Sequence, residues 1–244
     1  KVDKLIVIDD YVNKKHNCDI FINHNFMNEK SKKMIKTLNP KSQLFLGTDF
    51  FISNKKLFQK NRIRNNNIKE VFVFFGSSDP SNETFKVAKL LHRFNKLNFN
   101  ILIGKLNKNY KKISKYCGTK KNIKTFYNLN NDEVIRLMKR NDFSIGSGGI
   151  NLTERLFIGL PSIVISIAKN QEKAVKELKA RKLIYYLGSC KKVSSELIKK
   201  SIFRFIKEEK LFKKFKKKIS LIYKSTNNFE FFKYKLNLII DKSS

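Results

Sequence analysis

The stretch DFSIGSGGINLTERLFIGLPSIVIS, residues 142–166, holds four of the nine glycines in 244 residues: Gly146, Gly148, Gly149 and Gly159. The first three stand where a strand pattern gives way to a helical one. Their backbone can approach a ligand, and the first free N–H groups of the helix suit an anion such as a diphosphate. Ser147 lies in the same turn, and Glu154 can accept hydrogen bonds from sugar hydroxyls. A tight turn with Glu154 as an N-terminal helix acid explains the spacing equally well.

Two further turns place small or amide side chains directly after an apolar run. FFGSSDP ends its run in Gly76, Ser77 and Ser78, which can line a ligand crevice, and its Ser residues and Asp79 are also ordinary helix caps. In AKNQ, Asn170 and Gln171 offer donors and acceptors to sugar hydroxyls or phosphate oxygens, and the simpler alternative is an N-cap at Asn170. Ligands of doubly wound sheets sit at the carboxyl ends of the strands, so we expect these turns to share one crevice.

The elements that must position these turns alternate along the chain. Strand patterns occupy 4–10, 18–25, 42–47, 71–76, 99–104, 122–128, 142–146, 161–167 and 183–188. Helical patterns occupy 81–96, with Ser81 or Asn82 as its N-cap, 132–141, 152–159, 170–182 and the tail 194–244. The polar, Asn-rich stretch 53–70 is the best linker candidate. This order predicts an α/β fold with parallel, doubly wound sheets.

Charge is the most conspicuous feature of the composition, at +33 with 53 Lys and Arg against 20 Asp and Glu. Only eight of the cations are Arg, and the Lys residues are scattered, which favours a compositional origin over a nucleic-acid surface. We therefore do not expect nucleic acid as a partner. The basic amphipathic segment 210–224 makes weak membrane-surface association an alternative, although packing on its own domain is the commoner explanation.

Three widely spaced cysteines, Cys18, Cys117 and Cys190, are typical of reduced thiols and predict a cytoplasmic protein. No apolar run approaches the roughly 20 residues of a membrane helix. No Asp-x-Asp motif is present, so we predict no metal and no other cofactor, and we infer no obligatory protein partner. The opening KVDKLIVIDD is neither a start methionine nor a signal peptide, which indicates a fragment of a longer protein.

The motifs IDDYVNKKHNCDIFINHN, LFLGTDFFI, FFGSSDPSNET and DFSIGSGGINLTERLFIGLPSIVISIAKNQ occur in that order between Val7 and Leu187. Together they resemble the UDP-2,4-diacetamido-2,4,6-trideoxy-β-L-altropyranose hydrolases of pseudaminic-acid biosynthesis. The resemblance implies two Rossmann-like domains of the GT-B type, the N-terminal one incomplete. It also implies a hydrolase in which water attacks the anomeric carbon, UDP leaves and the configuration inverts. A glycosyltransferase with the same UDP site is the alternative, and a basic nucleic-acid or membrane-surface binding protein is the second alternative.

The resemblance also assigns roles within a UDP-sugar site. Gly146, Ser147, Gly148 and Gly149 would face the diphosphate, Glu154 the ribose hydroxyls, and Gly76, Ser77 and Ser78 the diphosphate–sugar side. Thr153, Asn170 and Gln171 would neighbour phosphate and sugar, and Tyr127 or Phe126 would flank uracil. The implied domains are 1–64, a remnant of the first domain with its linker, 65–228, which binds UDP, and 229–244, a C-terminal helix that packs back on the first domain.

The catalytic base stays unknown from the sequence. The resembling family begins with a Gly-x-Gly-His segment whose His is the proposed base, and this chain does not contain it. His16 lies in a polar loop and His92 on an amphipathic helix, so both are better explained as structural or solvated. His24 follows a strand pattern and leaves slightly more room for a role at a site.

Overall fold

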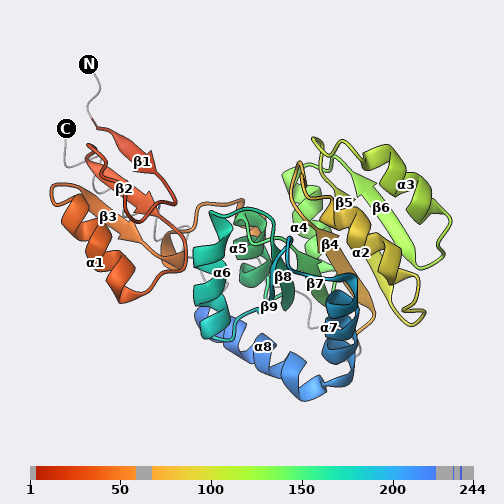
Figure 1. Ribbon diagram of the computed structural model, residues 1–244. Coiled ribbons are helices and arrows are strands. Elements are labelled where there is room, and N and C mark those ends of the chain that lie inside the picture. Colours follow the sequence, from red (N-terminus) through yellow and green to blue (C-terminus); the bar gives the residue numbers. More distant parts are fainter. Residues whose placement is uncertain (1–3, 59–67, 224–232, 234–236, 238–244) are drawn as a thin grey trace. The chain divides into compact units, whose positions relative to one another are not determined.

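The computed structural model describes residues 4–58 and 68–223, together with Lys233 and Asn237 (Figure 1). These residues form two compact units that divide between Lys55 and Lys56. The boundaries expected at 64/65 and 228/229 lie outside the described residues, as does most of the expected helix 229–244.

The first unit is a three-stranded parallel sheet with one α-helix. Its strands are β1 (Ile6–Ile8), β2 (Ile20–Asn23) and β3 (Gln43–Leu46), in that spatial order. Helix α1 (Glu29–Leu38) begins at the N-cap Asn28, whose side chain accepts from the N–H of Ser31, and the short 3-10 helix η1 spans Thr48–Phe50. The central strand β2 is buried on both sides, as a parallel strand in a core should be. The three strand predictions are confirmed.

The second unit contains six parallel strands in the order β6-β5-β4-β7-β8-β9 (Figure 1). They are β4 (Glu70–Phe74), β5 (Asn98–Ile103), β6 (Ile123–Tyr127), β7 (Phe143–Gly146), β8 (Ser162–Ser166) and β9 (Tyr185–Ser189). The chain builds β4 to β6 outward on one side and then returns beside β4 to build β7 to β9 on the other. The strand order therefore reverses between β4 and β7, the switch point at which such sheets bind ligands.

Helices connect and cover these strands. They are α2 (Glu83–Leu91), α3 (Tyr110–Gly118), α4 (Asn131–Lys139), α5 (Ile150–Phe157), α6 (Gln171–Ala180), α7 (Ser195–Lys207) and α8 (Glu209–Ile222), with a 3-10 helix η2 at Lys55–Leu57. The predicted α/β class with parallel sheets is confirmed. Helices α1 and α3 were not predicted, because each carries few apolar residues in a Lys-rich segment.

The two ends of the second unit contain segments for which the sequence offered an interpretation: the expected linker 53–70 and the basic amphipathic segment 210–224. Leu57, within the expected linker 53–70, is fully buried, and residues 59–67 of that segment lie outside the described residues. In the basic helix α8, Phe212, Phe215 and Ile219 are buried, so its apolar face packs within the protein as the simpler explanation required. Among the described residues, no helix has the length and apolar character needed to span a bilayer.

Candidate functional site

The glycine turn lies at the switch point of the six-stranded sheet. Gly146 ends β7 and pairs in register with Phe74, the last residue of β4. A Cβ on Gly146 would lie 2.1 Å from the carbonyl oxygen of Phe74, so glycine is required here for the approach of two strands. The N–H of Ser147 donates to the same carbonyl at 3.3 Å. At Gly146, therefore, close backbone packing explains the glycine without a ligand.

The next peptide, between Ser147 and Gly148, is held from both sides. The guanidinium of Arg155 donates from Nη2 to the Ser147 carbonyl. On the opposite side the Gly148 N–H donates to Oε1 of Gln171 at 3.3 Å, and the N–H of Ile167 donates to the same oxygen at 3.1 Å. Gln171 thus ties the glycine turn to the end of β8, and Arg155 and Gln171 fix the shape of the turn before any ligand arrives.

Beyond this peptide the backbone has free donors. Helix α5 has Gly149 as its N-cap, which supplies no side-chain cap. Within the described residues nothing accepts a hydrogen bond from the N–H groups of Gly149, Ile150 or Asn151. Free amides at a helix N-terminus, in the positive end of the helix dipole, form an anion site in many nucleotide-binding proteins. The arrangement suits the diphosphate expected from the sequence.

Helices α2 and α4, which follow strands β4 and β6 of the same sheet, do not offer this. In α2 the carboxylate of Asp79 accepts from the N–H groups of Glu83 at 3.0 Å and Thr84 at 2.8 Å. In α4, Asn130 and Glu133 form a reciprocal capping box. These carboxylate and amide oxygens already occupy the positions that a ligand anion would take. The open N-terminus of α5 therefore stands apart from α2 and α4.

The predicted ribose contact, Glu154, lies on α5 next to the open turn. Its Oε2 accepts from Nδ2 of Asn151 at 2.9 Å, and the same Nδ2 lies 3.5 Å from the sulfur of Met138. Thr153 precedes it and is half-buried. Asn151 was not predicted from the sequence; its place in the first turn of α5, three residues before Glu154, is the signal that could have found it. A carboxylate held in this way can accept hydrogen bonds from a diol.

The second predicted turn, Gly76 to Ser78, lies across the switch point from Gly146. Gly76 has φ +98°, and Ser77 and Ser78 are exposed. The backbone of Ser77 packs so closely on Gly104 that a Cβ there would lie 2.3 Å from the Ser77 Cα. The capping interpretation is confirmed for this turn: Asn82, one of the two residues expected, is the N-cap of α2, and the side chain that accepts from the first N–H groups is that of Asp79.

The residue that closes the start of α2 is Asp79, 2% exposed, and burial raises the pKa of its carboxyl above the usual range. Asn82 is in the left-handed region and makes no side-chain cap. The two exposed serines are therefore left as the side chains of this turn that can meet a ligand.

The remaining predicted residues differ in their roles. Asn170 is exposed and is the N-cap residue of α6, as the simpler alternative expected, although its side chain makes no capping hydrogen bond. Tyr127 is 41% exposed at the end of β6, with its ring stacked on Tyr110 at 4.2 Å between centroids. Strand β6 is three strands from β7, about 14 Å at the usual strand spacing. Tyr127, with its neighbour Phe126, therefore shares the sheet edge but not the immediate surroundings of the glycine turn.

The histidines are placed differently from one another. His92 is exposed after α2. His16 stacks on Phe21, and its Nε2 lies 3.1 Å from a carboxylate oxygen of Asp9, in contact but without hydrogen-bond geometry. His24, at the carboxyl end of β2, is nine-tenths buried, and neither ring nitrogen has a partner among the described residues. Across all the residues that the structure describes, no group of three His, Cys, Asp or Glu side chains could hold a metal ion.

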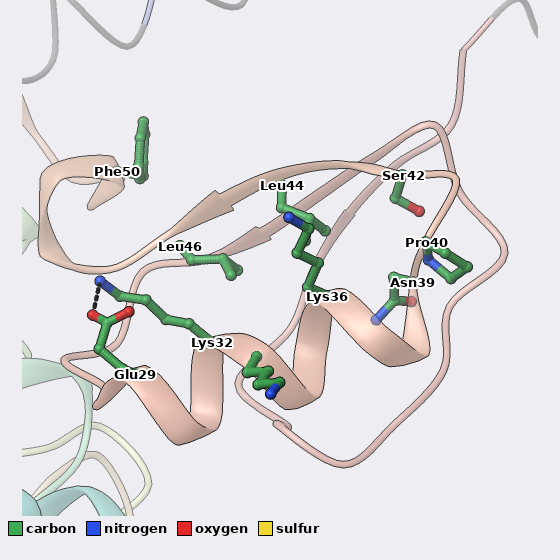
Figure 2. A pocket seen from close by; sticks show the side chains of 10 residues that line it. Glu29, Lys32, Lys36, Asn39, Pro40, Ser42, Leu44, Leu46 and Phe50 are labelled. Atoms are coloured by element: carbon green, nitrogen blue, oxygen red, sulfur yellow. Dashed lines mark hydrogen bonds and ion pairs between the residues drawn. The ribbon is translucent and has the colours of Figure 1, made fainter.

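A pocket of about 620 Å³ lies elsewhere, in the first unit between α1 and β3 (Figure 2). Lysines of α1 and the apolar side chains of Leu44, Leu46 and Phe50 line it, and Lys32 pairs with Glu29 at 2.8 Å. It includes none of the residues singled out from the sequence. Size alone does not assign a function to it, and the chemistry of the α5 terminus makes that terminus the better candidate.

Comparisons with known proteins define the class of fold. No family model matches the chain. An uncharacterized protein of Methanocaldococcus jannaschii is 33% identical over 151 residues, which is 59% of this chain and 29% of that protein. The chain therefore spans less than a third of the length of this relative.

Solved structures with the same fold include three with sequence identities of 12–16%. The glycotransferase of kitacinnamycin matches 93% of this chain and 55% of its own, with a TM-score of 0.60. UDP-GlcNAc 2-epimerase of Neisseria meningitidis, bound to UDP-GlcNAc, matches 92% and 61% with a TM-score of 0.60. MurG of Acinetobacter baumannii matches 82% and 61% with a TM-score of 0.56. The chain thus has the GT-B-like fold that glycosyltransferases and UDP-sugar epimerases share, with Rossmann-like parallel sheets.

Proposed function

We propose that this chain belongs to an enzyme that acts on a UDP-linked sugar, and that the diphosphate binds the open N-terminus of α5. The observation that carries the proposal is the set of free N–H groups at Gly149, Ile150 and Asn151, at the switch point of the sheet and with Glu154 on the same helix. A protein of the same fold was solved bound to UDP-GlcNAc, which supports a nucleotide-sugar ligand.

The reaction that we propose is hydrolysis of a UDP-linked diacetamido-trideoxy sugar, with inversion. A water oxygen forms a bond to the anomeric carbon, the bond from that carbon to the β-phosphate oxygen breaks, and its electron pair leaves with UDP. The water proton passes to a base, which we assign to no described residue. Free amides at α5 stabilise the negative charge that develops on the departing diphosphate. The sequence motifs between Val7 and Leu187 support the hydrolase, and the fold supports a UDP-sugar glycosyltransferase equally.

Calorimetric titration of UDP into the chain tests the site. We expect binding by the parent and a loss of about tenfold or more in affinity for Glu154→Ala, because a carboxylate that accepts hydrogen bonds from the ribose is removed. Glu209→Ala makes the same change in the first turn of α8 and should bind UDP like the parent. Equal UDP affinity in the parent and Glu154→Ala would contradict the ribose assignment, and a folded parent that does not bind UDP would contradict the site itself.

Product analysis separates hydrolase from transferase. UDP released from the altrose-type sugar nucleotide in water alone supports the hydrolase. UDP that forms only when an acceptor hydroxyl is added supports the glycosyltransferase. A parent that binds UDP but releases none under either condition would leave the nucleotide site in place and contradict both reactions for this chain.

A further inference from the structure

Arg155 is a fully buried cation immediately behind the glycine turn. Its side chain is 0% exposed, and its guanidinium donates to three neutral acceptors on β7, the turn and α5. Nε donates to the Asn151 carbonyl at 3.3 Å, Nη1 to Oγ of Ser144 at 3.1 Å, and Nη2 to the Ser147 carbonyl. Within the described residues it forms no ion pair. Arginine is almost never fully buried in proteins without a paired negative charge.

Burial lowers the pKa of Arg155 to about 9, and the neighbouring Glu154 carboxylate acts in the opposite direction. The guanidinium therefore remains charged at neutral pH, at a cost in desolvation that its three neutral acceptors do not offset fully. A protein core rarely retains such a cost without a use for the charge. The charge lies one peptide behind the free N–H groups of α5, so its field and that of the helix N-terminus have the same sign at the same place.

We propose that Arg155 supplies the countercharge for a doubly negative diphosphate at α5, and so makes the site prefer a nucleoside diphosphate to the uncharged nucleoside. This inference rests on the proposed function. Arg155 is a positioning residue, because it acts on the ligand across the turn and does not touch it. It donates to the Ser147 carbonyl, and Gln171 accepts from the Gly148 N–H. The next three N–H groups then stay free for the ligand.

A purely structural role would produce a different result. Arg155 also joins the buried serines, since Ser144 and Ser162 lie 2.8 Å apart through their hydroxyl oxygens. If Arg155 served only to hold this network and the turn, its loss would weaken the binding of charged and uncharged ligands alike. A charge that acts on the diphosphate changes the affinity for UDP far more than that for uridine, because uridine carries no phosphate.

The experiment compares UDP and uridine as probes by calorimetry, for the parent and for Arg155→Met and Arg155→Lys. We expect Arg155→Met to lower the ratio of UDP to uridine affinity by roughly tenfold or more. Arg155→Lys keeps the charge and should hold the ratio within about threefold of the parent. The control Ser144→Ala removes a neutral partner of Arg155 and should leave the ratio unchanged.

The possible outcomes are distinct. An unchanged ratio in Arg155→Met, or an equal fall in Arg155→Met and Arg155→Lys, would overturn the countercharge. If Arg155→Met does not fold, Arg155→Gln gives the same comparison, because it also removes the charge while its amide nitrogen takes the position of the Arg155 Nε, which donates to the Asn151 carbonyl. A parent that binds neither probe would contradict the proposed function, whereas a parent that binds UDP with an unaltered ratio in the variants would contradict only the role of Arg155.

Discussion

At the scale of single residues, His24 is a buried histidine of the first unit whose ring makes no hydrogen bond to any described residue. It follows the buried strand β2, its ring meets Phe51 edge-on at 5.0 Å, and both ring nitrogens lack partners among the described residues. The preceding Asn23 is also buried, with Nδ2 unpartnered. Desolvation by burial lowers the pKa of His24 below its usual value, and the charge of Asp10 offsets part of this effect.

His24 should therefore make the protein less stable in mild acid. Below a pH of about 6.5 the unfolded chain binds a proton at this histidine, while the folded protein resists it. The free energy of unfolding should consequently fall as the pH drops through that range, and His24→Phe should flatten the fall. Urea denaturation followed by circular dichroism between about pH 5 and pH 8 measures it. The exposed His92→Gln is the control and should keep the pH dependence of the parent; a flattening in both variants alike would refute the assignment to His24.

At the scale of elements, the join between β4 and β7 is the tightest packing at the candidate site. Gly146→Ala would press a methyl group against the Phe74 carbonyl, and that backbone atom cannot rotate away. We expect a loss of about 1–3 kcal/mol in the free energy of unfolding, as for overpacked cores. The matched change Gly118→Ala, at the end of α3 with open space around the Cβ position, should be neutral or stabilising by up to about 1 kcal/mol. Denaturant midpoints measure both, and equal effects would show that the strand contact is not the cause.

Elements were more predictable than the contacts between them. Strands β4 and β8 are buried on both faces of the sheet, and such strands have continuous apolar sequences. The runs 71–76 and 161–167 therefore identified them from the sequence alone. Proximity of Gly76 and Gly146 followed from the rule for parallel sheets: Gly146 ends β7, and Gly76 lies two residues after the end of the neighbouring strand β4. Asp79 was among the caps expected from the sequence, because a cap acts on its own helix. The contacts of Arg155 and Gln171 were not predictable, because each depends on a backbone group brought near by folding. Lys-rich helices such as α3 carry few apolar residues, in this case mainly the buried pair Ile113 and Cys117, and that short period was not sufficient to indicate a helix.

At the scale of the whole molecule, the net charge is +33, and several of the few acidic side chains are bound to backbone N–H groups. Asp79 caps α2, Asp142 accepts from the N–H groups of Lys69 and Glu70, and Asp19 accepts from that of Leu5. Many lysines, by contrast, are scattered over helices and loops in the described residues. We expect such a distribution to raise the local concentration of small anions, whereas a duplex requires an organised stripe of cations.

This field should act on the rate at which UDP arrives. We expect the association rate constant for UDP to fall several-fold as salt rises from about 50 to 500 mM, because mobile ions screen charges beyond a Debye length of roughly 10 Å. The dissociation rate constant should change less, since in the proposed complex the short-range contacts of α5 hold the diphosphate. Stopped-flow measurements with a fluorescent UDP analogue separate the two rates, with duplex DNA as a comparison that should lose its binding at physiological salt. If salt changes only the dissociation rate constant of UDP, the surface lysines do not steer the ligand. If duplex DNA stays bound at physiological salt, the nucleic-acid alternative is favoured instead.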